Sequence, residues 1–403
     1  MRKEFILCTA ALAGLLFLAG CGVDMTGDEF PYRVTVDPSL ANIVYVDHQL
    51  AKAGTLVKVG VKSGAEDILY NNSFVYGDTI IEIPENSVYG AFTMPRKDIH
   101  ITMEQTKWHF SSVAPAADFV NTIGPRAKDG YRFYVDLAAN GTQVPTVLNS
   151  SGKKVTVIIR DANAIKTLTL SGSGSLFTLL GGVTLMLDGI VTLEGHSSNN
   201  APLIQVGDGS RLLLNWGTIR HNGSTSSSND GGGVYVGSGG TFTMTNGTIT
   251  ANYAGRGGGV YVCPGGTFTM NGGSISGNFA TSYGWGGGVF VDTSAYYDYY
   301  SNTMVSNPGT FIMNGGTIQT NTASRGGGVY VHYDGYEGYE GSSGVFVKSG
   351  GAIEGGGTGS SNIATSGSGN GHAAYLGAGA KYRDATADPG DYLDSRNGAG
   401  FLP

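Results

Sequence analysis

The sequence contains little charge, little proline and few cysteines. Charged residues make up 14% of the 403 residues, only 12 residues are Pro and 3 are Cys, and the formal net charge is -7. This negative balance argues against nucleic acid as a partner. The low charge does not indicate disorder, because β-branched and aromatic residues are abundant and periodically placed, as in an ordered β protein.

Glycine, by contrast, occurs 67 times, more than twice its usage of about 7% in ordinary domains. It has no three-residue period, which excludes a collagen helix. Instead, a unit recurs that consists of GGGVYV, a short Gly-rich turn, TFTMNGG(T/S)I and a trailing Asn. Its copies are Gly231 to Asn252, Gly257 to Asn278, Gly286 to Asn321 and Gly326 to Ile353, with a degenerate copy from Leu203 to Asn222. A recurring unit of short strands and glycine corners predicts a solenoid.

The alternation within each unit predicts which side chains fill the core. The outer valines of VYV share one face, as do Phe and Met of the next strand, and a single Ile follows. If the coils stack in register, equivalent residues such as Val260 and Val289 become neighbours in a dry ladder of like on like.

A second ladder is predicted from asparagine, which follows each ladder Ile by three positions. Its amide can hydrogen-bond up and down the stack and satisfy backbone groups at the corner. The predicted members are Asn222, Asn252, Asn278 and Asn321. The repeated turns contain no Asp and the calcium-binding nonapeptide GGxGxDxUx is absent, so we predict no metal site and no cofactor.

The N-terminus has the pattern of an export signal, with Arg2 and Lys3 before an apolar run from Phe5 to Leu18. Leu18-Ala19-Gly20-Cys21 resembles a bacterial lipobox. The resemblance implies that residues 1–20 are a signal peptide and that the thiol of Cys21 carries a lipid, which makes a membrane the first partner. The apolar run is too short to be a bilayer-spanning anchor.

Lipidation of Cys21 would leave a single free thiol in the mature chain. Cys8 would leave with the signal peptide and Cys21 would be modified, so Cys263 has no partner for an intrachain disulfide. Gly22 stands where an Asp would indicate retention in the inner membrane. The expected location is therefore the bacterial outer membrane or cell surface, reached by export.

Three regions follow a tether at residues 21–30. Residues 31–106 show strand after strand with turn signals between them, which predicts a small antiparallel β domain. The runs AKAGTLVKV from Ala51 and GAFTMPRKDIHITME from Gly90 resemble the bacterial B-repeat extracellular module, which implies a spacer or stalk. In the linker 107–130, a helical period after Pro115, at Ala116, Phe119, Val120 and Ile123, predicts a short capping helix that closes the open end of the solenoid.

Residues 131–403 resemble the right-handed parallel β-helix proteins and, among these, the repeats of polymorphic outer-membrane proteins and other bacterial adhesins. The predicted fold is therefore all-β: a right-handed parallel β-helix solenoid, preceded by the small antiparallel β domain and the capping helix. The resemblance does not define an activity, because enzymes, tailspikes and adhesins share this fold.

Two rows of side chains are expected on the outside of the coils. The middle residues of the VYV strands form an aromatic row of Tyr235, Tyr261, Phe290, Tyr330 and Tyr375. Such a row either stabilises the stack or offers a stripe for sugar or protein binding. The residues before GGG form the second row, Asp230, Arg256, Trp285 and Arg325, in which opposite charges can pair and Trp285 can make cation–π contacts with its arginine neighbours.

The strongest candidate binding surface comes from two insertions. Residues 292–308 and 332–343 leave the same corner of neighbouring coils, so we expect them to protrude side by side. They carry the candidate ligand-contacting residues Tyr296, Tyr297, Tyr299, Tyr300, Tyr333, Tyr336 and Tyr339. Tyrosine provides a large contact area at a low entropic cost, and loops on a rigid scaffold commonly bind ligands. The alternative is a solvated acidic loop without a binding role.

These features favour a lipid-anchored surface protein that binds a glycan or a protein of a host or neighbouring cell, acts in adhesion and is not catalytic. One alternative is a polysaccharide lyase or glycosidase, for which His332 with Asp334 and Arg325 is the nearest candidate group. The regular strands carry almost no carboxylates, which hydrolysis requires in pairs. The other alternative is a purely structural surface spacer.

Overall fold

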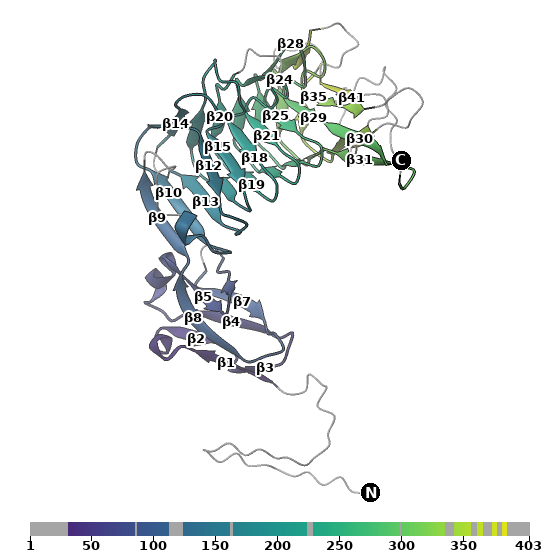
Figure 1. Cartoon of the computed structure of the whole chain (residues 1–403). Helices are drawn as coiled ribbons and strands as arrows, with labels where there is room; N and C mark the ends of the chain where they lie inside the picture. Colours follow the sequence, from purple (N-terminus) through teal and green to yellow (C-terminus); the bar gives the residue numbers. More distant parts are fainter. Residues whose placement is uncertain are drawn as a thin grey trace, which may run out of the picture. The chain divides into compact units, whose positions relative to one another are not determined.

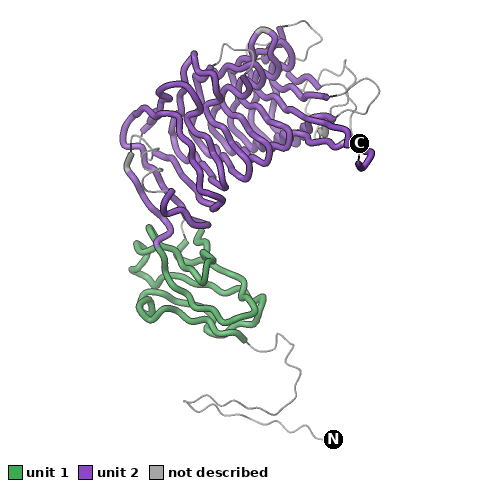
Figure 2. The backbone as a smooth tube through the Cα atoms, in the orientation of Figure 1, with its two compact units in different colours: residues 1–104 green, residues 105–403 purple. Residues whose placement is uncertain are grey.

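The computed structural model describes residues 31–84, 87–112, 124–161, 164–223, 229–298, 300–334, 342–355, 361–365, 373–376 and 381–384 (Figure 1). The chain forms two compact units, residues 1–104 and residues 105–403 (Figure 2). The predicted signal peptide, Cys21 and the tether lie outside the described residues. Among the described helices, none is long and apolar enough to cross a bilayer.

The first unit is the predicted small β domain. One sheet has the order β3-β1-β8-β5-β6 and the other β2-β4-β7. The pairing is antiparallel in β1–β3, β2–β4, β4–β7 and β5–β6, whereas β1 and β8 are parallel. The elements are β1 (Tyr32–Val36), η1 (Pro38–Leu40), β2 (Val44–Val46), β3 (Leu50–Ala51), β4 (Leu56–Val61), η2 (Glu66–Tyr70), β5 (Asn72–Tyr76), β6 (Thr79–Ile81), β7 (Tyr89–Thr93) and β8 (Ile99–Gln105).

The second unit is a parallel β-helix with three long sheets. The sheet that we call the Phe sheet contains β9 (Lys107–Ser112), β10 (Arg132–Leu137), β13 (Thr156–Arg160), β16 (Thr184–Leu187), β19 (Arg211–Leu214), β22 (Thr241–Met244), β26 (Thr267–Met270), β32 (Thr310–Met313), β38 (Val345–Lys348) and β42 (Lys381–Asp384). The Ile sheet contains β11 (Gly141–Gln143), β14 (Lys166–Leu170), β17 (Val191–Glu194), β20 (Thr218–Arg220), β23 (Thr248–Thr250), β27 (Ser274–Ser276), β33 (Thr317–Gln319) and β39 (Ala352–Ile353). The Tyr sheet contains β12 (Thr146–Asn149), β15 (Phe177–Leu180), β18 (Ile204–Val206), β21 (Val234–Val236), β25 (Val260–Val262), β29 (Val289–Val291), β35 (Val329–Val331) and β41 (Ala374–Leu376). Figure 1 shows β12, β15, β18 and β21 side by side as successive coils.

Within the described residues, three smaller sheets also belong to this unit. The corner sheet contains β24 (Tyr253–Arg256), β28 (Phe279–Trp285), β34 (Thr322–Ala323) and β40 (Ile363–Ala364). Two antiparallel hairpins are formed by β30 (Thr293–Asp298) with β31 (Thr303–Pro308) and by β36 (Tyr333–Asp334) with β37 (Ser342–Ser343).

The predicted register is confirmed. Val260 pairs with Val289 in the Tyr sheet, and Phe268 pairs with Phe311 in the Phe sheet. These four side chains are fully buried. The phenyl rings stack almost parallel, with centroids 4.6 Å apart for Phe242 and Phe268 and 4.8 Å apart for Phe268 and Phe311. Because each coil presents the same shape to the next, like residues stack on one another in the core.

The asparagine ladder is also confirmed. Side-chain bonds of 3.0 Å join Asn252 to Asn278 and Asn278 to Asn321. A bond of 2.9 Å continues from Asn321 to Asn362, which the sequence analysis had not included. Each amide also donates to a backbone carbonyl, as Asn278 does to Ile249 at 2.9 Å. The residues before the ladder asparagines adopt positive φ, namely His221, Ala251, Gly277 and Thr320.

Glycine is required where the coil turns into VYV. Gly257 has a φ of 63°, in the left-handed region that favours glycine. A Cβ on Gly258 would lie 2.6 Å from the carbonyl oxygen of Phe279 and 2.7 Å from that of Gly287. The GGG corner therefore lets the backbones of adjacent coils approach closely.

The start of the solenoid differs from the prediction. It was expected at residue 131, but β9 begins at Lys107 and pairs in parallel with β10, so residues 107–112 are part of the β-helix. Trp108 stacks on Phe133 with ring centroids 5.0 Å apart, which extends the core column beyond the recognisable repeats. The predicted capping helix, at residues 115–123, lies outside the described residues. Only the short turn α2 (Gly124–Arg126) follows it.

Candidate binding site

The outer row of the Tyr sheet is a continuous ring stack. Ring centroids are 5.2 Å apart for Tyr235 and Tyr261, 5.3 Å for Tyr261 and Phe290, and 5.1 Å for Phe290 and Tyr330. Tyr261, Phe290 and Tyr330 are buried, whereas Tyr235 is half-buried. Burial raises the pKa of the Tyr330 hydroxyl to about 12. Of the two alternatives for this row, the burial of Tyr261 and Tyr330 favours stabilisation of the stack over an open stripe for a ligand.

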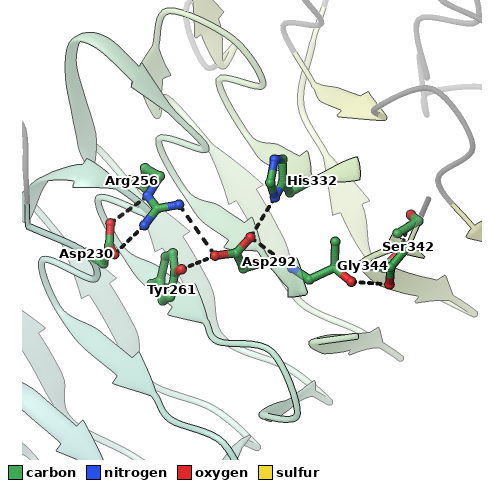
Figure 3. Close-up of polar contacts among 9 residues, drawn as sticks. Asp230, Arg256, Tyr261, Asp292, His332, Ser342 and Gly344 are labelled. Carbon is green, nitrogen blue, oxygen red and sulfur yellow. Dashed lines mark hydrogen bonds and ion pairs between the residues drawn. The ribbon is translucent and has the colours of Figure 1, made fainter. Parts of the chain in front are cut away.

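Asp292 is the centre of a polar cluster on this outer face (Figure 3). It is the first residue after β29, and 11% of its side chain is exposed. Its carboxylate accepts hydrogen bonds from the Tyr261 hydroxyl and, at 2.9 Å, from the backbone N–H of Thr293. His332 Nδ1 lies 2.7 Å from Asp292 Oδ1. Asp292 therefore ties together three successive coils of the stack.

Arg256 joins Asp292 to a second carboxylate. Its Nε donates to Asp230 Oδ1 at 2.8 Å and its Nη2 to Asp230 Oδ2 at 2.7 Å, a bidentate pair. Its Nη1 lies 3.4 Å from Asp292 Oδ2. The pairing predicted for Asp230 and Arg256 on neighbouring coils is thus confirmed. Such two-point contacts fix the guanidinium geometry more firmly than a single ion pair does.

Trp285 is placed differently from the expectation. Its indole stacks on Tyr330, with ring centroids 5.3 Å apart, and on Phe290 at 6.3 Å. The guanidinium of Arg256 instead lies over Tyr261 and Phe290, at 5.1 Å and 5.3 Å from the ring centroids. Trp285 therefore packs against the rings of the aromatic row and not against its arginine neighbours.

The two carboxylates of the cluster have pKa values shifted in opposite directions. Burial raises the pKa of Asp230 above its usual range, and the Arg256 contact only partly offsets this. Burial acts in the same direction on Asp292, but hydrogen bonds from His332, Tyr261 and the Thr293 N–H outweigh it and hold its pKa below the usual range. Burial, together with the adjacent Asp292 carboxylate, also raises the pKa of the Tyr261 hydroxyl. The carboxyl groups of Asp230 and Asp292 thus have different pKa values because their hydrogen-bonding partners differ.

The two predicted insertions form the two hairpins, and these lie side by side, as expected. β30 and β31 both contact β37. Thr293 Oγ1 lies 2.5 Å from Ser342 Oγ, and Ser306 Oγ lies 2.8 Å from the same atom. The hairpins therefore share a hydroxyl network at their base, next to the Asp292 cluster.

The hairpins present part of the predicted tyrosine set to solvent. Tyr296 is 62% exposed and Tyr300 is fully exposed, whereas Tyr297 and Tyr333 are half-buried. Near the tip, Asp298 accepts a hydrogen bond of 2.9 Å from the Tyr300 N–H and one of 2.8 Å from the Ser301 hydroxyl. Tyr299, Tyr336 and Tyr339 lie outside the described residues.

The catalytic group considered in the sequence does not assemble. His332 contacts Asp292, while Asp334 is exposed on β36. The guanidinium of Arg325 lies over the Tyr375 ring, 5.8 Å from its centroid. Sequence proximity suggested Asp334, but His332 is the first residue after β35 and contacts Asp292, the equivalent residue after β29 on the preceding coil.

A further insertion was missed. Ala254 pairs with Ala280 and Arg256 with Trp285, so residues 281–284 stand opposite the single Gly255. They carry Tyr283, which is 89% exposed. The signal was present in the sequence, because the interval from ladder Asn to GGG, five residues from Asn252 to Gly257, is eight from Asn278 to Gly286.

Two small clefts flank the Asp230–Arg256 pair. One, of about 240 Å³, is lined by Asn200, Gln205, Asn229, Asp230 and Tyr235, among others. The other, of about 180 Å³, is lined by residues that include Arg256, Tyr283 and Trp285. A larger cleft, of about 760 Å³, lies in the small β domain beside β1 and β2 and includes Arg33, Tyr45 and Lys62.

Within the described residues, no group of three or more His, Cys, Asp or Glu side chains is arranged to hold a metal ion. The fold defines the chain as a parallel β-helix protein with two hairpins on one outer face. Comparison with protein-family models, with curated proteins and with solved structures finds no match for this chain. What the protein does is therefore inferred from its own residues.

Proposed function

We propose that this protein is held at the bacterial cell surface by a lipid on Cys21 and that its β-helix binds a glycan or protein ligand through the paired hairpins without transforming it. One observation carries this proposal: the two insertions lie together, and the first presents Tyr296 and Tyr300 to solvent. Exposed, amphipathic tyrosines on a hairpin favour adhesion to a partner surface.

The base of the hairpins is well suited to this role. Asp292 and Thr293 connect the first hairpin to the buried ring stack and to Ser342 of the second. A loop whose base is fixed loses less conformational entropy when it binds, so the contact surface is pre-organised. The regular coils below it act as a rigid support.

The direct test replaces both exposed tyrosines. We expect Tyr296→Ala with Tyr300→Ala to reduce binding to cells or to an immobilised glycan array at least tenfold, with an unchanged melting temperature. Tyr70→Ala is the matched control, because Tyr70 is also exposed, at 57%, but lies in the small β domain. Full binding by the double variant would show that the hairpin tyrosines do not contact the ligand, whereas no binding by the wild type would favour a purely structural spacer.

The anchor is tested separately. The lipobox-like sequence before Cys21 supports lipidation of its thiol. We expect Cys21→Ser to move the protein from the membrane fraction to the soluble fraction and to abolish labelling by a radioactive fatty acid. A Cys8→Ser control should leave both unchanged.

Glycoside hydrolysis is the second candidate, and one observation favours it. Asp230 and Asp292 lie on the same outer face with pKa values shifted apart, and such pairs supply the acid and the base of hydrolases. Both carboxylates are, however, occupied by Arg256, and Asp292 also by Tyr261 and His332. An assay for new reducing ends, run with the wild type and with Asp230→Asn, distinguishes hydrolysis from binding. Turnover that this variant abolishes would establish the enzyme.

A lyase is less well supported by this geometry. β-Elimination from a uronate needs a base and a cation that neutralises the sugar carboxylate. Arg256 is the cation at the cluster, and it already contacts two carboxylates. Its positive charge is therefore compensated before any acidic sugar arrives.

A further inference from the structure

A cleft lies at the insertion of residues 281–284. The insertion stands opposite Gly255 where β24 and β28 pair, and the cleft is lined by residues that include Arg256, Tyr283 and Trp285. The indole of Trp285 is held in place by its stacking on Tyr330. Tyr283, at 89% exposure, is the most exposed ring of this cleft. The cleft thus combines one fixed and one accessible aromatic side chain.

The second cleft lies next to the first and has a different chemistry. Gln205 and Tyr235 occupy equivalent positions on adjacent coils, and both line it. Asn200 and Asn229 contribute amides. The two clefts meet at the Asp230–Arg256 ion pair, because Asp230 lines one and Arg256 lines the other.

We propose that these two clefts together bind a linear, electrically neutral oligosaccharide that runs along the stack of coils. This inference rests on the proposed ligand-binding function but assigns it a separate site from the hairpins. Aromatic rings pack against the apolar C–H faces of sugar rings. Side-chain amides donate to and accept from sugar hydroxyls, and a carboxylate accepts from them. The first cleft provides aromatic rings, and the second provides the amides and the carboxylate.

The charge of the site selects a neutral sugar. Asp230 and Asp292 share the single guanidinium of Arg256, so the pair of clefts has no uncompensated positive charge for a uronate or sulfated sugar. The whole chain also has a formal net charge of -7, which disfavours acidic polymers at long range. Adjacent coils are about 4.8 Å apart, so successive coils offer contacts to successive units of one sugar chain.

The test is isothermal titration calorimetry of the full-length protein in detergent. The probes are cellohexaose, xylohexaose, mannohexaose and laminarihexaose, with hexagalacturonate as the acidic comparison. We expect at least one neutral hexasaccharide to bind and Tyr283→Ala to raise its Kd at least tenfold. Gln205→Ala, in the other cleft, should raise it severalfold.

The hairpin variant separates this site from the proposed function. Tyr296→Ala with Tyr300→Ala should leave the hexasaccharide Kd unchanged, even if it abolishes binding to cells. The proposal is overturned if no neutral hexasaccharide binds at millimolar concentration, if hexagalacturonate binds more tightly, or if Tyr283→Ala leaves the Kd unchanged. Circular dichroism of Tyr283→Ala checks that the fold is intact.

Discussion

The inside and the outside of the same coils follow opposite rules. Inside, Phe242, Phe268 and Phe311 repeat one side chain, and all three are fully buried. Outside, the row next to the Tyr sheet changes at every coil, from Asp230 to Arg256 to Trp285. The repeated interior provides stability that is nearly independent of position, whereas the varied exterior places different chemistry at fixed spacing. In this protein, departures from the repeat are the indicators of function.

The largest effect should come from breaking the interior ladder. Phe268→Ala removes a ring that stacks on both neighbours and leaves a cavity, so we expect a loss of about 3–5 kcal/mol in the free energy of unfolding. Urea denaturation followed by circular dichroism measures this. Thr269→Ala is the control, because Thr269 lies on the opposite face of the same strand and is half-buried. Similar losses for both variants would contradict the distinction between the two faces.

A smaller loss should follow from breaking the asparagine ladder. Asn278→Ala leaves the amide of Asn252 and the carbonyl of Ile249 without their partner in a dry corner. A buried polar group without a partner costs about 1–3 kcal/mol, and we expect the total loss in the free energy of unfolding to lie within that range. Asn314→Ala is the matched control, because Asn314 bonds to Asn271 at 2.9 Å in an equivalent stack that is exposed to water. A loss for Asn314→Ala as large as that for Asn278→Ala would show that burial does not determine the effect.

The exterior cluster should have the smallest effect, detectable as a change in pH dependence. The pKa of Asp292 is lowered in the folded state, so its contribution is present above the unfolded pKa of about 3.9 and is lost as the pH falls through the folded value. Asp230 has a raised pKa, so its contribution has the opposite sign: protonation in acid removes a penalty. We therefore expect Asp292→Asn to reduce the loss in the free energy of unfolding that occurs as the pH falls below about 5, and Asp230→Asn to increase that loss. Melting temperatures measured across that pH range test both expectations. If the melting temperatures of the two variants depend on pH in the same way, the assigned directions of the pKa shifts are wrong.

Much of the β-helix could be predicted from the sequence because its constraints are local and repeated. Strand alternation places Val260 and Phe268 inside whatever the exact coil length, and the same pattern recurs in the next unit. The adjacency of the two hairpins also followed, since equivalent corners of stacked coils must be neighbours. The start of the solenoid at Lys107 did not follow, because β9 pairs with β10 without any trace of the GGG motif.

The candidate site was only partly predictable. Tyr296 and Tyr300 were found as tyrosines in insertions, and Tyr283 could have been found from the longer interval between Asn278 and Gly286. The contact between His332 and Asp292 could also have been found, because each is the first residue after its VYV-type strand and stacking places equivalent residues side by side. The contact of Asp292 with Arg256 could not be found from the register alone, because these residues do not occupy equivalent positions.

The amino-acid sequence by itself determined the stacking of like residues, the buried ladders and the corners from which the insertions leave, because these follow from periodicity and backbone sterics. Only the tertiary structure decided that Tyr261 and Tyr330 are buried. It also decided that Asp292 contacts side chains of the coils before and after it, and that one cleft lies on each side of the Asp230–Arg256 pair. Those outcomes depend on distances between side chains on different coils. The spacing of residues within one coil does not specify them.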